Sequence, residues 1–109
     1  NPNMVKGQMC GGLVQGLGEC LWEEIRFDGE GRVANIGFGD YRLPTAADVP
    51  EIECHIVEGE TSTSRGHGCK GVGEPAHVPA LAAAANAVCA AIGRRIYESP
   101  LSPERILGA

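Results

Sequence analysis

The strongest constraint on the fold of this chain is the segment from about Met4 to Leu21. Its apolar residues recur with the period of a helix, and it contains five glycines. The apolar positions of this stretch are Val5, Met9, Leu13, Leu17, Cys20 and Leu21. The glycines are Gly7, Gly11, Gly12, Gly16 and Gly18. Each glycine inside a helix costs about 1 kcal/mol relative to alanine. We therefore expect this helix to use its glycines for the close approach of another element or of a ligand.

Two glutamines share the glycine-bearing side of this helix. Gln8, Gly11, Gly12 and Gln15 fall within an arc of about 100° when successive residues advance by about 100°. Glutamine amides both donate and accept hydrogen bonds, so these side chains can bind polar groups of whatever approaches the helix. The alternative interpretation is tight packing of the helix on a sheet, with both glutamines in solvent.

A second constraint is the segment Lys70-Gly71-Val72-Gly73-Glu74-Pro75, which places one carboxylate between a glycine-rich loop and an alanine-rich helical pattern. Pro75 suits the first position of a helix, so Glu74 is expected at or near the N-cap, where the helix dipole favours its charged form. A held, ionised carboxylate on a tight loop is a candidate general base. In the alternative interpretation, Glu74 only supports the start of the helix.

The remaining patterns predict a single domain, residues 1–109, of the α+β class. Three strands are expected, at residues 22–27, 32–36 and 51–57, and the loop 37–50 is expected to contain a short extended piece at 40–43. The first two would be joined by a hairpin turn at 28–31. A second helix is expected from Pro75 to about Ile96, and a short last helix begins at Ser102. The two main helices would pack on a small, mainly antiparallel sheet of about three or four strands.

Charge and hydropathy disfavour two classes of partner. The net charge is −5, without the clustered lysines and arginines that nucleic acid requires. No apolar run reaches the roughly 20 residues that span a membrane, and no charged-then-apolar leader opens the chain. The first residues, Asn1-Pro2-Asn3, are interpreted as an internal point of a longer protein sequence. This is an ordinary soluble globular profile, and the expected location is the cytoplasm.

The five cysteines have wide spacings, an odd count and no C-x-x-C motif. This pattern predicts free thiols in a reducing compartment. His55, His67 and Cys69 offer a conceivable metal cluster, but their spacing matches no structural zinc pattern. Solvated loop residues are the favoured interpretation, and no protein-bound metal is predicted.

Two further features have an ordinary structural interpretation. Glu51 and Glu53 alternate with apolar residues, so they are expected on the solvated face of a strand rather than as an acid–base pair. Trp22 can serve as a stacking platform, but an aromatic side chain at the edge of the core is the favoured interpretation.

Several motifs occur in a fixed order along nearly the whole chain. They are Gly7-Gln8-x-x-Gly11-Gly12-x-x-Gln15-Gly16-x-Gly18, Glu23-Glu24, Asp40-Tyr41, Leu43-Pro44-Thr45-Ala46-Ala47-Asp48-Val49-Pro50, Lys70-Gly71-Val72-Gly73-Glu74 and Pro100-Leu101-Ser102-Pro103-Glu104-Arg105-Ile106-Leu107. In this order they resemble the C-terminal part of the molybdopterin-binding large subunit of the xanthine oxidase family of molybdenum hydroxylases. That family includes xanthine dehydrogenases, aldehyde oxidoreductases and carbon monoxide dehydrogenases.

The resemblance implies an enzyme that hydroxylates an aldehyde or an aromatic N-heterocycle with oxygen from water. Its cofactor would be molybdenum with molybdopterin, in the cytosine dinucleotide form, and no side chain would ligate the metal. Glu74 matches the family's general base. Gln8 matches a glutamine that lies against the pterin, and Gly71, Val72 and Gly73 match the loop that lines the metal site.

The large subunit of that family is several times longer than this chain. The resemblance therefore implies a fragment or split subunit that is inactive by itself. Its partners would be the remainder of the large subunit, iron–sulfur and flavin (FAD) domains or subunits, and a small-molecule substrate. Two other functions compete with this one: a small α+β interaction module that forms homo-oligomers by pairing exposed strand edges, and a His/Cys metal protein.

Overall fold

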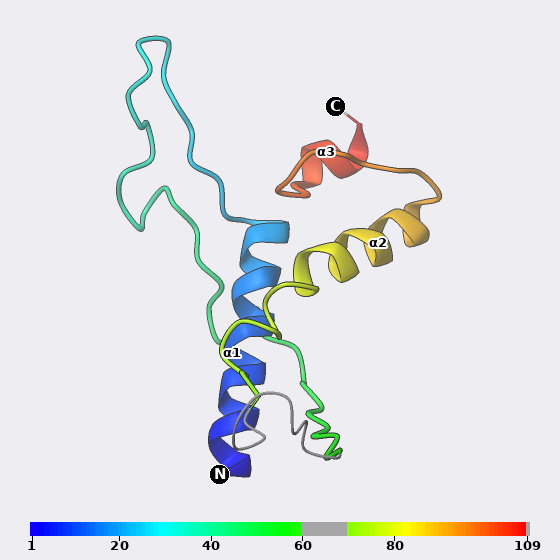
Figure 1. The fold of residues 1–109 in the computed structure, drawn as a ribbon. Helices are drawn as coiled ribbons and strands as arrows, with labels where there is room; N and C mark the ends of the chain where they lie inside the picture. Colours follow the sequence, from blue (N-terminus) through cyan, green and yellow to red (C-terminus); the bar gives the residue numbers. More distant parts are fainter. Residues whose placement is uncertain (60–69, 109) are drawn as a thin grey trace.

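A computed structural model describes residues 1–59 and 70–108 of the chain (Figure 1). Its described helices are α1 (Pro2–Leu21), α2 (Ala80–Ile92) and α3 (Pro103–Leu107). Figure 1 shows residues 22–59 leaving the C-terminal end of α1 as an extended arm and returning along the helix towards its N-terminal half. The described part of the chain is elongated, with extents of 53 × 34 × 29 Å.

The predicted glycine-rich helix is confirmed as α1. Its start is fixed by Asn1, whose side-chain Oδ1 accepts hydrogen bonds from the amides of Asn3 (3.1 Å) and Met4 (3.4 Å). Pro2 occupies the first helical position, where the missing amide hydrogen costs nothing. The helix therefore begins two residues before the expected Met4, and it ends at the expected Leu21.

The second helix is shorter than predicted at both ends. Residues 75–79 form turns instead of helix, because Pro79 disfavours a helical residue before it and cannot donate an amide hydrogen bond. The amides of His77 and Val78 donate to the carbonyl of Glu74 at 2.9 and 3.3 Å. At the other end, Gly93 takes a left-handed conformation (φ 72°) and ends the helix before Ile96.

The predicted sheet, and with it the α+β class, is wrong. Among residues 1–59 and 70–108, the strand pairing is a single antiparallel bridge between Phe27 and Val33. The turn between them is present, with the Asp28 amide bonded to the Arg32 carbonyl at 2.9 Å. The predicted strand 51–57 runs without a ladder among the described residues. The interaction module with paired strand edges loses its basis, because the described residues offer no sheet to extend.

The hairpin stops after one bridge because a side chain takes the place of the next ladder bonds. The amide of Arg26 donates to Oδ1 of the buried Asn35 at 2.9 Å. Nδ2 of Asn35 donates to the carbonyl of Glu24 at 2.6 Å. These backbone groups are satisfied by Asn35, so they are not available to a partner strand.

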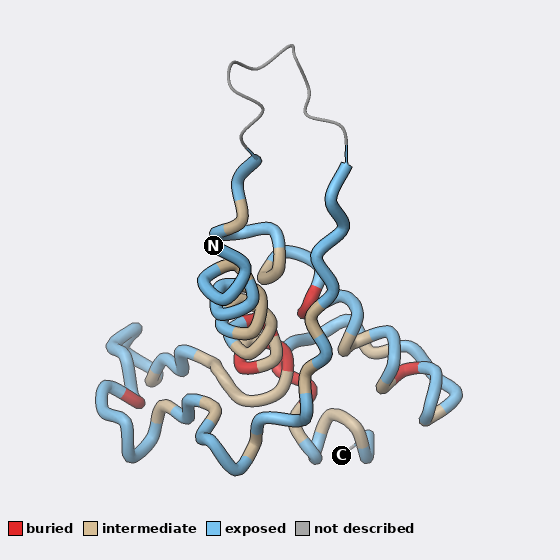
Figure 2. Tube along the Cα trace, turned by 90° about the horizontal axis from the view of Figure 1, so that it is seen from below, coloured by how far each residue is buried: buried red, intermediate tan, exposed pale blue. Residues whose placement is uncertain are grey.

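The small core lies where α1 meets α2 and the C-terminal segment. Its buried apolar residues are Cys20, Ala80, Cys89 and Leu101. Figure 2 shows buried positions along α1 and the segments packed against it, whereas most of the trace is exposed. A Cβ built on Gly16 would lie 2.5 Å from the Ala80 Cβ and 3.0 Å from the His77 carbonyl oxygen. The expected close approach to the glycines of α1 is confirmed here.

The C-terminal segment completes the last turn of α1. The Leu101 amide donates to the Cys20 carbonyl at 2.7 Å, and the Ser99 hydroxyl donates to the Glu19 carbonyl at 2.9 Å. Carbonyls at a helix end have no partner inside the helix, so these bonds satisfy groups that would otherwise be unpaired. Arg105 adds an ion pair with Glu24 at 2.8 Å, just beyond the helix.

Trp22 follows α1 directly and is half-buried, as expected for an aromatic side chain at the edge of the core. The Arg42 guanidinium lies over its ring, 5.1 Å from the centroid. Arg42 also pairs with Asp48 at 3.0 Å. The amide and hydroxyl of Thr45, with a smaller contribution from Arg42, lower the pKa of Asp48. These contacts attach the 42–48 segment to the end of α1.

Candidate functional site

Glu74 lies at the end of the 70–74 loop, before the turns that lead into α2. Because α2 starts at Ala80, with Pro79 as its N-cap, the expectation that Glu74 lies at or near the N-cap is wrong. The Glu74 side chain is exposed, and its backbone carbonyl holds the following turn. Within the described residues, no side chain or amide donates a hydrogen bond to its carboxylate, whose oxygens are hydrogen-bond acceptors.

The 70–74 loop lies beside α1. Nε2 of Gln8 is 3.8 Å from the position that a Cβ on Gly73 would occupy. Val72 is half-buried, whereas Gly71 and Gly73 are exposed. The structure thus brings Gln8 to the loop that carries Glu74, although the two segments are far apart in sequence.

The glycine side of α1 divides into a packed part and an open part. A Cβ on Gly12 would lie 3.0 Å from the His77 amide nitrogen and 3.1 Å from the Ala76 Cβ. In contrast, a Cβ on Gly7 or Gly11 would meet no atom of the described residues within 4 Å. The open part adjoins Gln8, so α1 offers bare backbone and one amide side chain on the same surface.

His77 was missed by the sequence interpretation. Its Nε2 lies 3.0 Å from Oε2 of Glu19, so it ties the turn after Glu74 to α1. The spacing of Gly12, Gly16 and Glu19 could have indicated this contact, because these residues are positions i, i+4 and i+7 and therefore share one face of the helix. This face accepts the 76–80 turn and thereby positions the loop before it.

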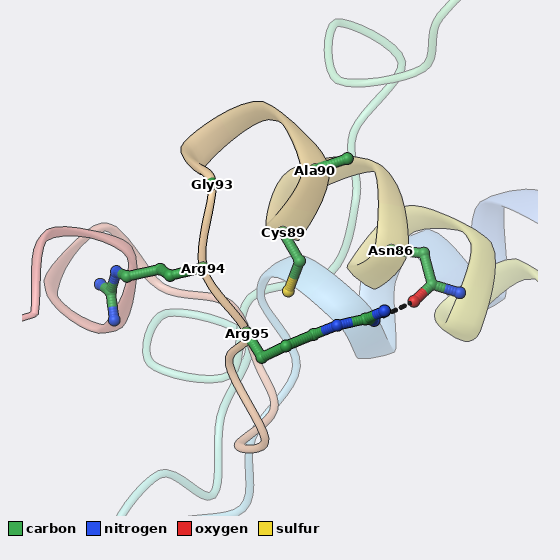
Figure 3. A pocket seen from close by; sticks show the side chains of 6 residues that line it. All are labelled: Asn86, Cys89, Ala90, Gly93, Arg94 and Arg95. Carbon is green, nitrogen blue, oxygen red and sulfur yellow. Dashed lines mark hydrogen bonds between the residues drawn. The ribbon is translucent and has the colours of Figure 1, made fainter.

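Other polar groups in the structure lie away from this site. Figure 3 shows a pocket of about 590 Å³ at the C-terminal end of α2, opposite the end that follows Glu74. Its lining residues are Asn86, Cys89, Ala90, Gly93, Arg94 and Arg95. Both arginines are already engaged, since Arg95 donates to Asn86 Oδ1 and Arg94 donates to the carbonyl of Arg105, each at 2.9 Å.

The alternative metal cluster gains no support from the residues that can be described. His67 and Cys69 lie outside them, and His55 is exposed, 3.5 Å from the Glu53 carboxylate. Across residues 1–59 and 70–108, no three histidine, cysteine or acidic side chains gather as metal ligands do. The four described cysteines are free thiols.

Comparison with known proteins identifies the family. The profile of the molybdopterin cofactor-binding domain matches residues 1–50. The xanthine dehydrogenase molybdenum-binding subunit of Escherichia coli O157:H7 is 41% identical over 108 residues, which cover 97% of this chain and 14% of that subunit. The nicotine 6-hydroxylase large subunit of Paenarthrobacter nicotinovorans is 38% identical, over all of this chain and 14% of that subunit. This chain belongs to the molybdenum hydroxylase family.

A solved structure of a related enzyme also has the fold of this chain. The crystal structure of quinoline 2-oxidoreductase from Pseudomonas putida 86 superposes with a TM-score of 0.90 at 38% identity, over 99% of this chain and 14% of that one. The resemblance of the ordered motifs is thereby confirmed. Gln8 and the glycines of α1 lie within the profile match, whereas the 70–74 loop lies beyond it but inside the aligned relatives.

The chain spans about 14% of the length of these relatives. In the part of the chain that the structure describes, no helix combines the length and apolar character needed to cross a membrane.

Proposed function

We propose that this chain forms part of a molybdopterin-dependent hydroxylase that converts an aldehyde or an aromatic N-heterocycle with oxygen from water, and that Glu74 is its general base. The observation that carries this proposal is the position of Gln8 beside the loop before Glu74, with Nε2 of Gln8 3.8 Å from the place that a Cβ on Gly73 would occupy. It joins an open helix surface, suited to a bound group, to an accessible carboxylate, suited to proton transfer.

The residues around Gln8 fit the cofactor that the family name implies. Gln8 offers amide donors and acceptors, and the loop Gly71-Val72-Gly73 lies beside it without bulky side chains at either glycine. The bare backbone at Gly7 and Gly11 permits close approach. We infer that these residues hold molybdopterin, in its cytosine dinucleotide form. When bound, the metal supplies Lewis-acid activation of water and accepts the electrons of the oxidation.

The role of Glu74 follows from its position. A carboxylate with two accessible oxygens accepts a proton from a water or hydroxyl oxygen at hydrogen-bond distance. The turn bonds from His77 and Val78 to the Glu74 carbonyl fix the backbone at this residue. The His77–Glu19 contact then ties the turn to α1, which carries Gln8. The packing of the turn after Glu74 on α1 therefore positions both the proposed proton acceptor, Glu74, and the proposed cofactor surface around Gln8.

We further propose that the remainder of a large subunit covers the exposed apolar side chains of the arm. The large apolar residues that are more than half exposed there are Ile25, Phe27, Ile36, Phe38 and Val57. Contiguous exposed apolar surface marks an interaction site. Iron–sulfur and flavin domains or subunits would accept the electrons that the substrate loses. We propose the cytoplasm as the location, because thiols stay reduced there. The chain alone is then inactive, and turnover by the isolated chain supplied with molybdenum cofactor would contradict this.

Replacing Gln8 by alanine is expected to weaken cofactor retention by up to about tenfold, because one hydrogen bond contributes about 0.5–1.5 kcal/mol. Molybdenum and pterin content of the purified enzyme measures the effect. The control is Gln15→Ala, which removes another exposed glutamine from the same helix side. Equal cofactor content in both variants would show that Gln8 does not contact the cofactor.

A further inference from the structure

Two cysteines from distant parts of the chain meet at the surface of α1. The sulfur atoms of Cys10, in α1, and Cys54, in the returning arm, lie 3.4 Å apart. Both side chains are half-buried, so solvent and small reagents reach them. The proposed hydroxylase reaction uses neither thiol.

The arm residues around Cys54 hold it against the helix. Ile52 and Cys54 are half-buried, whereas the alternating neighbours Glu53 and His55 are exposed. The Cys54 sulfur also lies 4.0 Å from the carbonyl oxygen of Lys6, one turn before Cys10. Cys54 therefore rests on one turn of α1, and the meeting of the two sulfurs is a packed contact.

The distance between the sulfurs is short enough for bond formation. A disulfide bond is about 2.05 Å long, so the two atoms need to approach by about 1.3 Å. In the reduced protein, the hydrogen bond to Cys10, then burial, raises the pKa of Cys54. Cys54 is therefore held as a thiol at neutral pH until an oxidant arrives.

We propose that Cys10 and Cys54 form a reversible disulfide, closed by hydrogen peroxide and opened by a dithiol reductant. One sulfur attacks the peroxide, becomes a sulfenic acid and releases one water molecule. The other sulfur displaces the hydroxyl group of the sulfenic acid, which leaves as a second water molecule. The two thiols lose two electrons and two protons in total, and one peroxide molecule becomes two water molecules. The bond ties the arm to α1 two residues from Gln8.

The other described cysteines are poor competitors in this chemistry. Cys20 and Cys89 are buried, at 1% and 7% exposure. Burial, and then the nearby Cys89, raises the pKa of Cys20. Buried thiols without accessible thiolate react slowly with peroxide, so these two residues serve as internal controls.

The test is peptide mapping of the protein as its own gene encodes it, after treatment with hydrogen peroxide and alkylation of the remaining thiols. The expected product is a linked peptide pair containing Cys10 and Cys54, about 2 Da lighter than the two thiol peptides together. Dithiothreitol is expected to restore both free peptides. Linkage of either cysteine to Cys69 or to a second molecule, or alkylation of both at the untreated rate, would overturn the proposal.

A thermal measurement separates the bond from general oxidation. A disulfide across this separation is expected to raise the Tm of the oxidised protein by several degrees. The variant Cys54→Ser is expected to show no such rise after the same treatment. Peptide mapping of the unmodified sequence needs no variant, so the proposal remains testable if Cys54→Ser fails to fold. An equal rise in both proteins would contradict the proposed disulfide.

Discussion

Replacing Glu74 by glutamine in the assembled enzyme is expected to lower kcat by about 10²–10⁴-fold, the usual contribution of a general base. Glutamine keeps the shape of the side chain and its carbonyl acceptor, but it cannot take up a proton at neutral pH. Since the carboxylate makes no hydrogen bond to the described residues, the substitution should leave the fold and the molybdenum and pterin content largely unchanged. Steady-state kinetics and cofactor analysis of the same preparation measure both effects.

The matched control is Glu51→Gln, because Glu51 is also an exposed carboxylate of this chain. This variant should keep both turnover and cofactor content. If Glu74→Gln loses cofactor or folded protein in proportion to its activity, Glu74 has a structural role. Full activity of Glu74→Gln would remove it from the proton transfer altogether.

Adding a single methyl group at Gly16 is expected to destabilise the protein by about 1–3 kcal/mol, the usual cost of overpacking. The new Cβ would lie 2.5 Å from the Ala80 Cβ and 3.0 Å from the His77 carbonyl, so α1 and the start of α2 would have to separate. In the protein without cofactor, the same substitution at Gly11 should have the opposite sign. A Cβ there meets no described atom within 4 Å, and alanine is favoured over glycine in a helix by about 1 kcal/mol.

Chemical denaturation followed by circular dichroism measures this pair of variants. The midpoint of Gly16→Ala should fall and that of Gly11→Ala should rise, with the slope of the transition unchanged. Destabilisation of equal size at both positions would mean that Gly11 is also covered, either by residues 60–69 or by another part of the assembled protein. Stabilisation at both would mean that the packing of α1 on α2 is looser than the structure describes.

The helices and the use of their glycines could be predicted, because both depend on local rules. Gly16 has no reason to stand inside a helix unless something approaches it. Asn1 and Pro2 also mark a helix start, but they were interpreted as a cut into a longer sequence, so the start of α1 was expected two residues too late. The sheet could not be predicted correctly, because strand patterns do not say which segment pairs with which. Asn35 satisfies the backbone groups that a second strand would have used, and no sequence rule marked it for that role.

The candidate site was predicted in part. Local patterns singled out Glu74 and the glutamine side of α1 separately, but their proximity depends on how the 70–74 loop lies beside α1, and these two segments are far apart in the sequence. Only the family resemblance connected them. The position of Glu74 relative to α2 was misjudged, because Pro75 was taken as the first helical residue and the effect of Pro79 was overlooked.

The bonds at the end of α1 bear on how the protein is made. The carbonyls of Glu19 and Cys20 are satisfied by Ser99 and Leu101, and the Ser99 contact joins residues 80 positions apart. During synthesis, α1 therefore leaves the ribosome with its last turn unfinished until residues 99–101 have followed. Its C-terminal turn should be the part of the nascent protein most open to chaperones and proteases until translation of this segment is complete.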